Sequence, residues 1–398
     1  MAIARATRPR GLARPGDVSD AQGVADDIVT SGRQSPDPPG RSRWLAIGAA
    51  AVAVIAVTVF LVSRPHAGPQ ASPHSPGPSP GRGQLALPAA RGYPDAITAR
   101  VPVRNVISMA STGNGVWALT LSGELVRISA RTNRVTLRVH VPRAGVGGQL
   151  AAGRRTLWLD TCRASSGRVR LLGIDPATGR VRSRVAVSGS CGSIAYGLGH
   201  LWVVSGARNG IRILRINPST RRVDARTGII HSLVYSFVAG PEGVWYSTGS
   251  SIRQVAPSGT RLTGVKVNDS SYPFTLVDAE LTLGHGAVWA LSGDEGIARI
   301  DPATGGITAI VSYRSFDPTY AFTGGPFIDV GQGSLWLLAD LAHTQVLRVS
   351  MSTGQPLGRI RVGGSCGQPC SQIYDAAGAV WVPSGREIVR IDPARLPG

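Results

Sequence analysis

Short apolar runs separated by turn residues recur along residues 96–398, and one of these runs marks a regular repeat. In it an apolar residue is followed by Trp, and successive tryptophans lie 41, 44, 43, 44, 47 and 45 residues apart. A repeat of about 43 residues with four strand-like runs is typical of a β-propeller. The pattern therefore predicts an all-β fold with seven blades. The seven pairs are Val116-Trp117, Leu157-Trp158, Leu201-Trp202, Val244-Trp245, Val288-Trp289, Leu335-Trp336 and Val380-Trp381.

A second pattern follows several of the tryptophans, where an apolar residue leads into Asp-Pro or Asn-Pro. The Asp or Asn side chain can bond its own backbone, Pro fixes φ, and a closing Gly supplies a positive φ. We therefore expect a tight turn before the fourth strand of these blades. The copies span 174–179, 216–220, 300–305 and 391–393.

The two ends of the repeat region complement each other. Residues 97–103 alternate apolar and polar side chains, as the outer strand of a blade does, but they precede the first Trp. The last repeat lacks such a strand, because the chain stops soon after Asp392-Pro393. We therefore predict that residues 97–103 form the outer strand of the seventh blade, which removes free sheet edges from the ring.

The segment before the repeats divides into three parts by composition. Residues 1–43 have almost no bulky apolar side chains and predict a disordered tail. Residues 44–62 carry no charge and are just long enough for a transmembrane helix, although a cleaved signal peptide is an alternative. Residues 63–95 are rich in Pro, Gly, Ser and Ala and predict an extended stalk before the propeller at 96–398. Arginines precede the span, so we expect a cytoplasmic N-terminus, an extracytoplasmic propeller and a cell-membrane location.

The formal net charge is +19, and it is unevenly distributed. Residues 97–230 contain 21 Arg and 4 acidic residues, whereas residues 231–398 contain 11 basic and 13 acidic residues. Charges on outer strands can simply prevent edge-to-edge aggregation, or the basic side of blades 1–3 can attract an anionic polymer or lipid. No basic helix or aromatic groove points to nucleic acid. The outer-strand arginines are Arg131, Arg134, Arg138, Arg180, Arg182, Arg184, Arg221, Arg222 and Arg226.

The Trp strand, the turn at 299–305 and the repeat length together resemble the YVTN-repeat and streptogramin-lyase-like (virginiamycin B lyase-like) propellers. The resemblance covers residues 97–398 and implies a seven-bladed propeller. The lyases carry Trp-Phe-Thr-Glu strands, but here the third residue after each Trp is never Glu. The resemblance therefore implies a fold, and it supplies no residues for the family's metal-assisted lyase chemistry.

Four cysteines lie in the predicted extracytoplasmic domain, and an even number there favours disulfides over zinc. Cys162 follows the second strand of blade 2, and Cys191 precedes the first strand of blade 3. These loops emerge on the same face of neighbouring blades, so we predict a Cys162–Cys191 bond. Cys366 and Cys370 are close in sequence and form the second predicted pair.

The innermost strand of each blade can be aligned on its Trp. The residue eight positions before Trp is apolar and predicts a core position, whereas the residue nine positions before it is mostly polar and predicts a channel lining. The channel is either a water-filled space with satisfied polar walls or a ligand site that uses Gln149, Glu280 and Gln372. The predicted lining is Ser108, Gln149, Ser193, Ser236, Glu280, Phe327 and Gln372.

Two long loops on the same face contain clustered aromatic residues. One spans 268–274 and the other spans 313–322. Loops on rigid scaffolds often carry function, and Tyr with Arg suits protein or sugar recognition. A lid packed over its own blades is the alternative. The candidate contact residues are Tyr272, Phe274, Tyr313, Phe316 and Tyr320.

No nucleophile–base pair, phosphate loop or zinc pattern occurs in the sequence. No catalytic residue and no cofactor are therefore assigned, and a bound divalent metal has no supporting residues. The sequence predicts a membrane-anchored propeller that binds a protein, a glycan or an envelope polymer. The alternative is a lyase-like or hydrolase-like enzyme with a site over the central channel.

Overall fold

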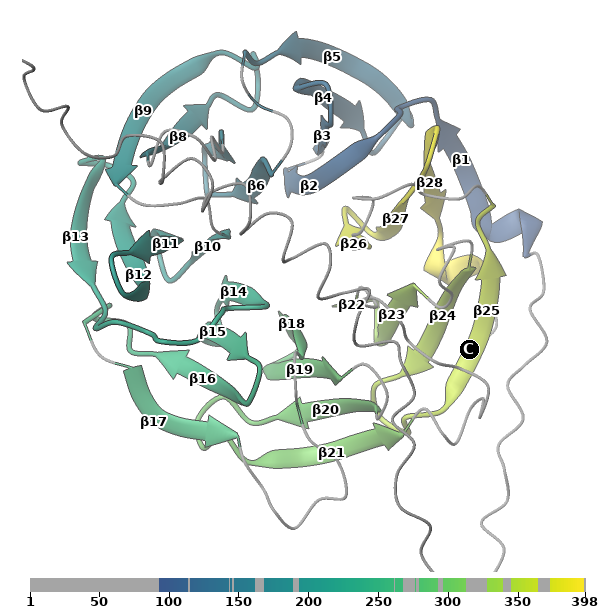
Figure 1. Cartoon of the computed structure of the whole chain (residues 1–398). Coiled ribbons are helices and arrows are strands. Elements are labelled where there is room, and N and C mark those ends of the chain that lie inside the picture. The colour runs from purple at the N-terminus through teal and green to yellow at the C-terminus, as the bar shows by residue number, and fades with distance from the viewer. Residues whose placement is uncertain are drawn as a thin grey trace, which may run out of the picture. The chain divides into compact units, whose positions relative to one another are not determined.

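A computed structural model of the chain describes most of residues 93–396. All of these residues fall in the compact unit Pro73–Gly398, and they form seven four-stranded antiparallel sheets around a central axis (Figure 1). The predicted all-β, seven-bladed propeller is therefore confirmed. The described residues are 93–113, 115–142, 144, 147–161, 168–188, 193–260, 262–267, 276, 279–292, 296–312, 328–338, 345–363 and 373–396.

Each blade places its first strand at the centre and its last strand at the rim (Figure 1). Two short 3-10 helices, η1 (Pro94–Ala96) and η3 (Pro393–Arg395), flank the strands. The strands are β2 (Val106–Thr112), β3 (Gly115–Thr120), β4 (Glu124–Ser129) and β5 (Arg134–His140) in blade 1; β6 (Gln149–Ala152), β7 (Leu157–Asp160), β8 (Arg168–Ile174) and β9 (Val181–Ser188) in blade 2; β10 (Ile194–Gly197), β11 (His200–Ala207), β12 (Gly210–Asn217) and β13 (Arg222–Arg226) in blade 3; β14 (Phe237–Gly240), β15 (Gly243–Thr248), β16 (Ser251–Val255) and β17 (Leu262–Val267) in blade 4; β18 (Glu280–Gly284), β19 (Ala287–Ser292), β20 (Gly296–Ile300) and β21 (Ile307–Ser312) in blade 5; β22 (Ile328–Gly331), β23 (Ser334–Leu338), β24 (Gln345–Ser350) and β25 (Pro356–Arg361) in blade 6; and β26 (Tyr374–Ala376), β27 (Ala379–Ser384), β28 (Glu387–Ile391) and β1 (Ile97–Val101) in blade 7.

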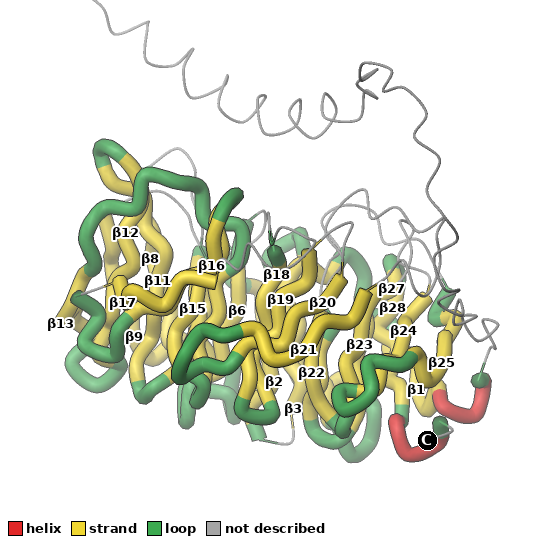
Figure 2. Tube along the Cα trace, turned by 90° about the horizontal axis from the view of Figure 1, so that it is seen from below, coloured by secondary structure: helices red, strands yellow, loops and turns green. Residues whose placement is uncertain are grey.

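The ring closes through its first and last strands, as the sequence predicts. Strand β1 pairs antiparallel with β28, with Ile97 opposite Ile391 and Val101 opposite Ile388. The backbone N–H of Asp392 also donates to the carbonyl of Ala96 at 2.8 Å. In the side view the strands of every blade run between the two faces of the disc (Figure 2). The closure therefore covers what would otherwise be the open edge of blade 7.

The seven repeated tryptophans form the core between blades. Each is at most 1% exposed. In the described part of the chain the core divides into seven apolar clusters, one for each pair of neighbouring blades, and each Trp belongs to the cluster shared with the following blade. A large flat ring fills the gap between two twisted sheets that shorter apolar side chains would leave open.

Five of the seven indole nitrogens donate to a residue in the inner strand of the same blade. Trp336 Nε1 donates to the carbonyl of Gly331 at 3.1 Å, and Trp202 Nε1 donates to that of Gly197 at 3.0 Å. A Cβ at Gly331 would overlap the carboxyl group of Asp375 in the next blade, so only glycine fits there. Trp158 Nε1 is buried and has no partner in the described structure.

The predicted Asp-Pro turns are confirmed with their expected hydrogen bonds. Asp175 Oδ1 accepts from the backbone N–H of Ala177 at 2.8 Å. Asp301 Oδ1 accepts from that of Ala303 at 2.8 Å. Gly179 has a φ of 69°, the left-handed conformation that closes the turn. The side chain therefore replaces a backbone turn bond and leads the chain into the outer strand.

No helix in the described part of the chain has the length and apolar character needed to cross a membrane. The predicted tail at 1–43, the predicted span at 44–62 and nearly all of the predicted stalk at 63–95 lie outside the described residues. These assignments stay predictions. The described structure begins at Tyr93, which is half-buried against the cluster between blades 6 and 7.

Candidate functional site

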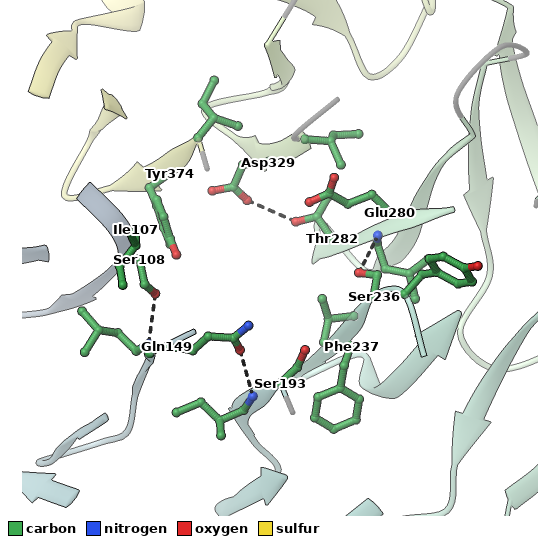
Figure 3. A pocket seen from close by; sticks show the side chains of 18 of the residues that line it. Ile107, Ser108, Gln149, Ser193, Ser236, Phe237, Glu280, Thr282, Asp329 and Tyr374 are labelled. Atoms are coloured by element: carbon green, nitrogen blue, oxygen red, sulfur yellow. Dashed lines mark hydrogen bonds between the residues drawn. The ribbon is translucent and has the colours of Figure 1, made fainter. Parts of the chain in front are cut away.

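The inner strands surround a cavity of about 470 Å³. All seven blades contribute to its lining, and the polar side chains converge on an open centre (Figure 3). Gly147 and Tyr235, from the linkers that lead into blades 2 and 4, also line the cavity. One polar residue from each blade in order is Ser108, Gln149, Ser193, Ser236, Glu280, Asp329 and Tyr374.

The inner strands follow the predicted burial pattern in the described residues, although six of the seven predicted core residues also border the cavity. The residues eight positions before each Trp are predicted to be core, and all seven are at most 7% exposed. Five of the seven predicted channel residues line the cavity, and the other two, Phe327 and Gln372, lie outside the described residues. The core residues are Met109, Leu150, Ile194, Phe237, Leu281, Ile328 and Ile373.

Three of the lining side chains hold neighbouring blades together. In each case the side chain nine positions before Trp accepts a hydrogen bond from a backbone N–H of the next blade. The donor is the core residue that lies eight positions before the Trp of that next blade. Gln149 is therefore used structurally through its oxygen, while its amide nitrogen is directed toward the open centre (Figure 3). The bonds are Leu150 N to Ser108 Oγ at 3.0 Å, Ile194 N to Gln149 Oε1 at 3.2 Å and Leu281 N to Ser236 Oγ at 3.0 Å.

Glu280 occupies the same repeat position in blade 5 but makes no bond of this kind within the described structure. Its partly buried side chain extends toward Asp329 and the open centre (Figure 3). Burial raises the pKa of Glu280 well above its usual range, and the nearby Asp329 carboxyl raises it further. Glu280 is thus a carboxyl group that the blade contacts leave available to the cavity.

Asp329 connects three blades. Its Oδ1 accepts from Thr282 Oγ1 of blade 5 at 3.1 Å and from the backbone of Val330 at 2.8 Å. Its Oδ2 accepts from the backbone of Asp375 in blade 7 at 2.6 Å. Burial raises the pKa of Asp329 to about 6, and the hydrogen bonds hold it below the value that burial alone would give. Asp329 is therefore a fixed part of the cavity wall.

Tyr374 completes the ring between blades 7 and 1. Its hydroxyl oxygen accepts from the backbone N–H of Met109 at 3.2 Å. Burial raises the pKa of Tyr374, so the hydroxyl stays protonated.

The sequence analysis missed Thr282, Asp329 and Tyr374 as lining residues. All three lie seven positions before a Trp, which is the next inward-facing position of the same alternation. The corresponding residues of blades 1 to 3 are alanines. The appearance of polar residues at this position in blades 5 to 7 is the signal that would have identified them.

Two exposed apolar side chains lie in the linker that leads into blade 4, and one of them, Tyr235, lines the cavity. Leu233 is 64% exposed and Tyr235 is 53% exposed, and both belong to the linker between β13 and β14. The backbone N–H of Tyr235 donates to the carbonyl of Ser247 at 3.0 Å, which fixes the end of this linker to blade 4. An anchored, exposed Tyr at the cavity, with an exposed Leu two residues before it, suits contact with a partner.

Several predicted site residues cannot be placed, because they lie outside the described residues. The two aromatic loops and both predicted disulfides stay predictions for this reason. These residues are Tyr272, Phe274, Tyr313, Phe316, Tyr320, Gln372, Cys162, Cys191, Cys366 and Cys370.

A buried carboxyl group lies deeper in blade 2. Asp160 is 0% exposed, and neither of its carboxylate oxygens has a hydrogen-bond partner within the described structure. It faces Gln149 and Leu171 across the neighbouring strands. Burial raises the pKa of Asp160 to about 7. Other blades place an apolar residue or Ser here, such as Leu119 and Leu291.

The nine predicted outer-strand arginines of blades 1 to 3 are all exposed. Arg138 pairs with Glu124 at 2.7 Å, and Arg182 pairs with Asp175. The other seven have no ion-pair partner in the part of the chain that the structure describes. This outer surface, which we call the basic rim, is open to an anionic partner.

The described lining of the cavity contains few kinds of polar group. Its described lining includes two carboxyl groups, hydroxyls and an amide, but no His, Cys, Lys or Arg. The described residues also contain no group of three or more His, Cys, Asp or Glu that could hold a metal ion. The arrangement can accept hydrogen bonds and attract positive charge.

The comparisons with known proteins identify the fold. The chain is similar to the WD40 β-propeller domain of Doa1, with a TM-score of 0.55 and 10% identity over 76% of this chain and 99% of that chain. It is also similar to the computationally designed Ika8 protein, with a TM-score of 0.51 and 10% identity over 78% of this chain and 99% of that chain. No protein-family model and no curated protein sequence matches the chain. The class is a β-propeller, and the resemblance to the lyase-like family stays a prediction.

Proposed function

We propose that this protein is a binding module that recognises its partner at the mouth of the central channel. The main support is the cavity of about 470 Å³, which is lined by all seven blades and by the exposed Tyr235, with the exposed Leu233 two residues before it in the same linker. Pockets of this size commonly hold small ligands or single side chains. The blade contacts keep the surrounding strands in place, so the site is largely formed before a partner binds.

We further propose that the propeller is anchored in a membrane and faces the extracytoplasmic side. This proposal rests on the uncharged run at 44–62, on the arginines that precede it and on the Pro-rich segment at 63–95. A protease added to intact cells should remove the propeller and leave a short membrane-bound fragment. Protection of the propeller in intact cells would contradict this orientation.

Site-specific cross-linking from the channel mouth tests the binding function. The full-length chain would carry Leu233→Ser together with Tyr235→Ala, and a control chain would carry Leu198→Ser. Leu198 is 38% exposed but lies in the turn between the first two strands of blade 3, at the other end of the channel. We expect the double change to abolish cross-links to the partner and the control to keep them. Equal loss or equal retention in both chains would contradict the proposal.

The basic rim supports a second binding surface, for an anionic envelope polymer. Seven exposed arginines that have no acidic partner among the described residues create a positive field that salt should weaken. Replacing Arg184, Arg222 and Arg226 with Ser should lower retention on a polyanionic column and reduce its salt dependence. Unchanged retention would indicate that these arginines serve only to protect the outer strands.

A further inference from the structure

We propose that the channel mouth binds an organic cation, an ammonium or guanidinium group, through the carboxylate of Glu280 beside Asp329. This inference deepens the proposed binding function and rests on it. It is carried by the place of Glu280 in the repeat, by the charges of the lining and by the size and character of the cavity.

The repeat itself singles out Glu280. At the same position Ser108, Gln149 and Ser236 each accept a backbone N–H from the next blade, and a neutral acceptor is enough for that role. The carboxylate of Glu280 is a stronger hydrogen-bond acceptor than these hydroxyl and amide oxygens, yet it makes no such bond in the described structure (Figure 3). A partly buried carboxyl group with no partner among the described residues is unfavourable when ionised. We therefore infer that the ionised carboxylate of Glu280 pairs with a positive group of a bound ligand.

The charges of the lining favour a positive ligand. The chain has 42 Lys and Arg against 23 Asp and Glu, yet the described lining contains Glu280 and Asp329 and no basic side chain. Asp329 cannot move to meet a ligand, because it already accepts three hydrogen bonds. We therefore assign direct contact to Glu280 and a supporting electrostatic role to Asp329.

The size and walls of the cavity favour an organic cation over a bare ion. Its volume of about 470 Å³ suits a side chain or a small molecule. Tyr235 and Phe237 also line it, and aromatic rings attract ammonium and guanidinium groups. The exposed Leu233 precedes Tyr235 by two residues in the same linker and can hold an apolar part of the same ligand.

Binding of a cation should be coupled to proton release. Without a positive neighbour, burial and Asp329 favour the protonated form of Glu280. A bound cation favours the ionised form, so binding expels a proton and strengthens as pH rises. The titratable groups that face Glu280 from the adjoining strands are Asp329 and, one blade further, Tyr374, which stays neutral.

Calorimetric titration of the full-length chain tests the inference. The probes are N-acetyl-arginine amide, which represents a peptide side chain, agmatine, which represents a free amine, and N-acetyl-citrulline amide, which is the uncharged isostere. We expect at least one cationic probe to bind about tenfold more tightly than citrulline amide. Titrations in two buffers of different ionisation enthalpy should show proton release, and this readout needs no variant.

Glu280→Gln should weaken binding of the cation about tenfold and abolish proton release, while Glu387→Gln should leave both unchanged. Glu387 carries the same charge but pairs with Arg100 at the edge of blade 7. Equal affinity for the citrulline and arginine probes would overturn the cation assignment and leave a neutral binding site. Calcium binding that displaces the amines would overturn it in favour of a metal site. If no probe binds, the cation assignment fails. If the cross-links also survive the changes at Leu233 and Tyr235, the proposed function fails as well.

Discussion

Asp160 should make the propeller less stable as the pH rises. Its carboxyl group is 0% exposed and has no hydrogen-bond partner in the described structure, so ionisation inside the fold is unfavourable. The folded chain holds the proton up to a pKa of about 7, whereas the ordinary value is 3.8. Between these values the folded state binds more protons than the unfolded state, so the free energy of unfolding falls with rising pH.

The size of the effect follows from the two pKa values. Each pH unit between 3.8 and about 7 changes the free energy of unfolding by about 1.4 kcal/mol. The full effect is therefore about 4 kcal/mol above pH 7, and it disappears below about pH 4. Leucine occupies the equivalent position in blades 1, 5 and 6, so three other blades of this fold already accommodate the side chain that Asp160→Leu introduces.

Denaturant unfolding of the full-length wild type and Asp160→Leu at pH 4.5 and pH 8 measures this difference. We expect the variant to be more stable at pH 8, by up to about 4 kcal/mol, and the gain to be much smaller at pH 4.5. Asp175→Asn is the matched control. The hydrogen bond from the N–H of Ala177 and the contact with Arg182 lower the pKa of the wild-type Asp175 carboxyl group. Its contribution to the free energy of unfolding is therefore lost as pH falls, which is the opposite direction to Asp160. A gain from Asp160→Leu that is the same at both pH values would refute the reasoning.

Three further predictions concern packing and ring closure. Trp336→Phe should destabilise the fold more than Trp158→Phe, by about 1 to 3 kcal/mol in chemical denaturation, because only Trp336 loses an indole hydrogen bond and leaves a carbonyl unpaired. Gly331→Ala should lower the Tm strongly, whereas Gly228→Ala should be nearly neutral, since a Cβ at Gly228 meets no atom within 4 Å; equal Tm values would contradict the close approach of blades 6 and 7. A chain that lacks residues 1–101 should show a lower Tm and increased light scattering, because β28 would become an open edge; unchanged behaviour would mean that β1 contributes little.

The fold was predictable because its signals repeat. A single Val-Trp pair indicates little, but seven at a spacing of about 43 residues determine the number of blades and the alignment of every inner strand. The same alignment correctly separated core residues such as Met109 from lining residues such as Ser108.

The site was less predictable, because repeat position does not reveal which hydrogen bonds form between blades. Gln149 and Glu280 look equivalent in the alignment, yet Gln149 accepts the N–H of Ile194 and Glu280 has no such bond among the described residues. The pattern also gave no sign that Asp329 would reach donors from blades 5 and 7, since those contacts depend on how neighbouring sheets pack. Leu233 and Tyr235 were missed because the sequences of the linkers between blades do not repeat.

The pairing of β1 with β28 sets the order in which the fold can be completed. The contact between Arg100 and Glu387 joins residues 287 positions apart, and closing a loop of that length costs about 5 kcal/mol in chain entropy. Each of blades 1 to 6 is made from one continuous segment and can form during synthesis of the chain. The pairing of β1 with β28 can form only after β28 has been synthesised. An incomplete ring therefore exposes the packing faces of two blades at once, and the slowest and most aggregation-sensitive step of folding should be its closure.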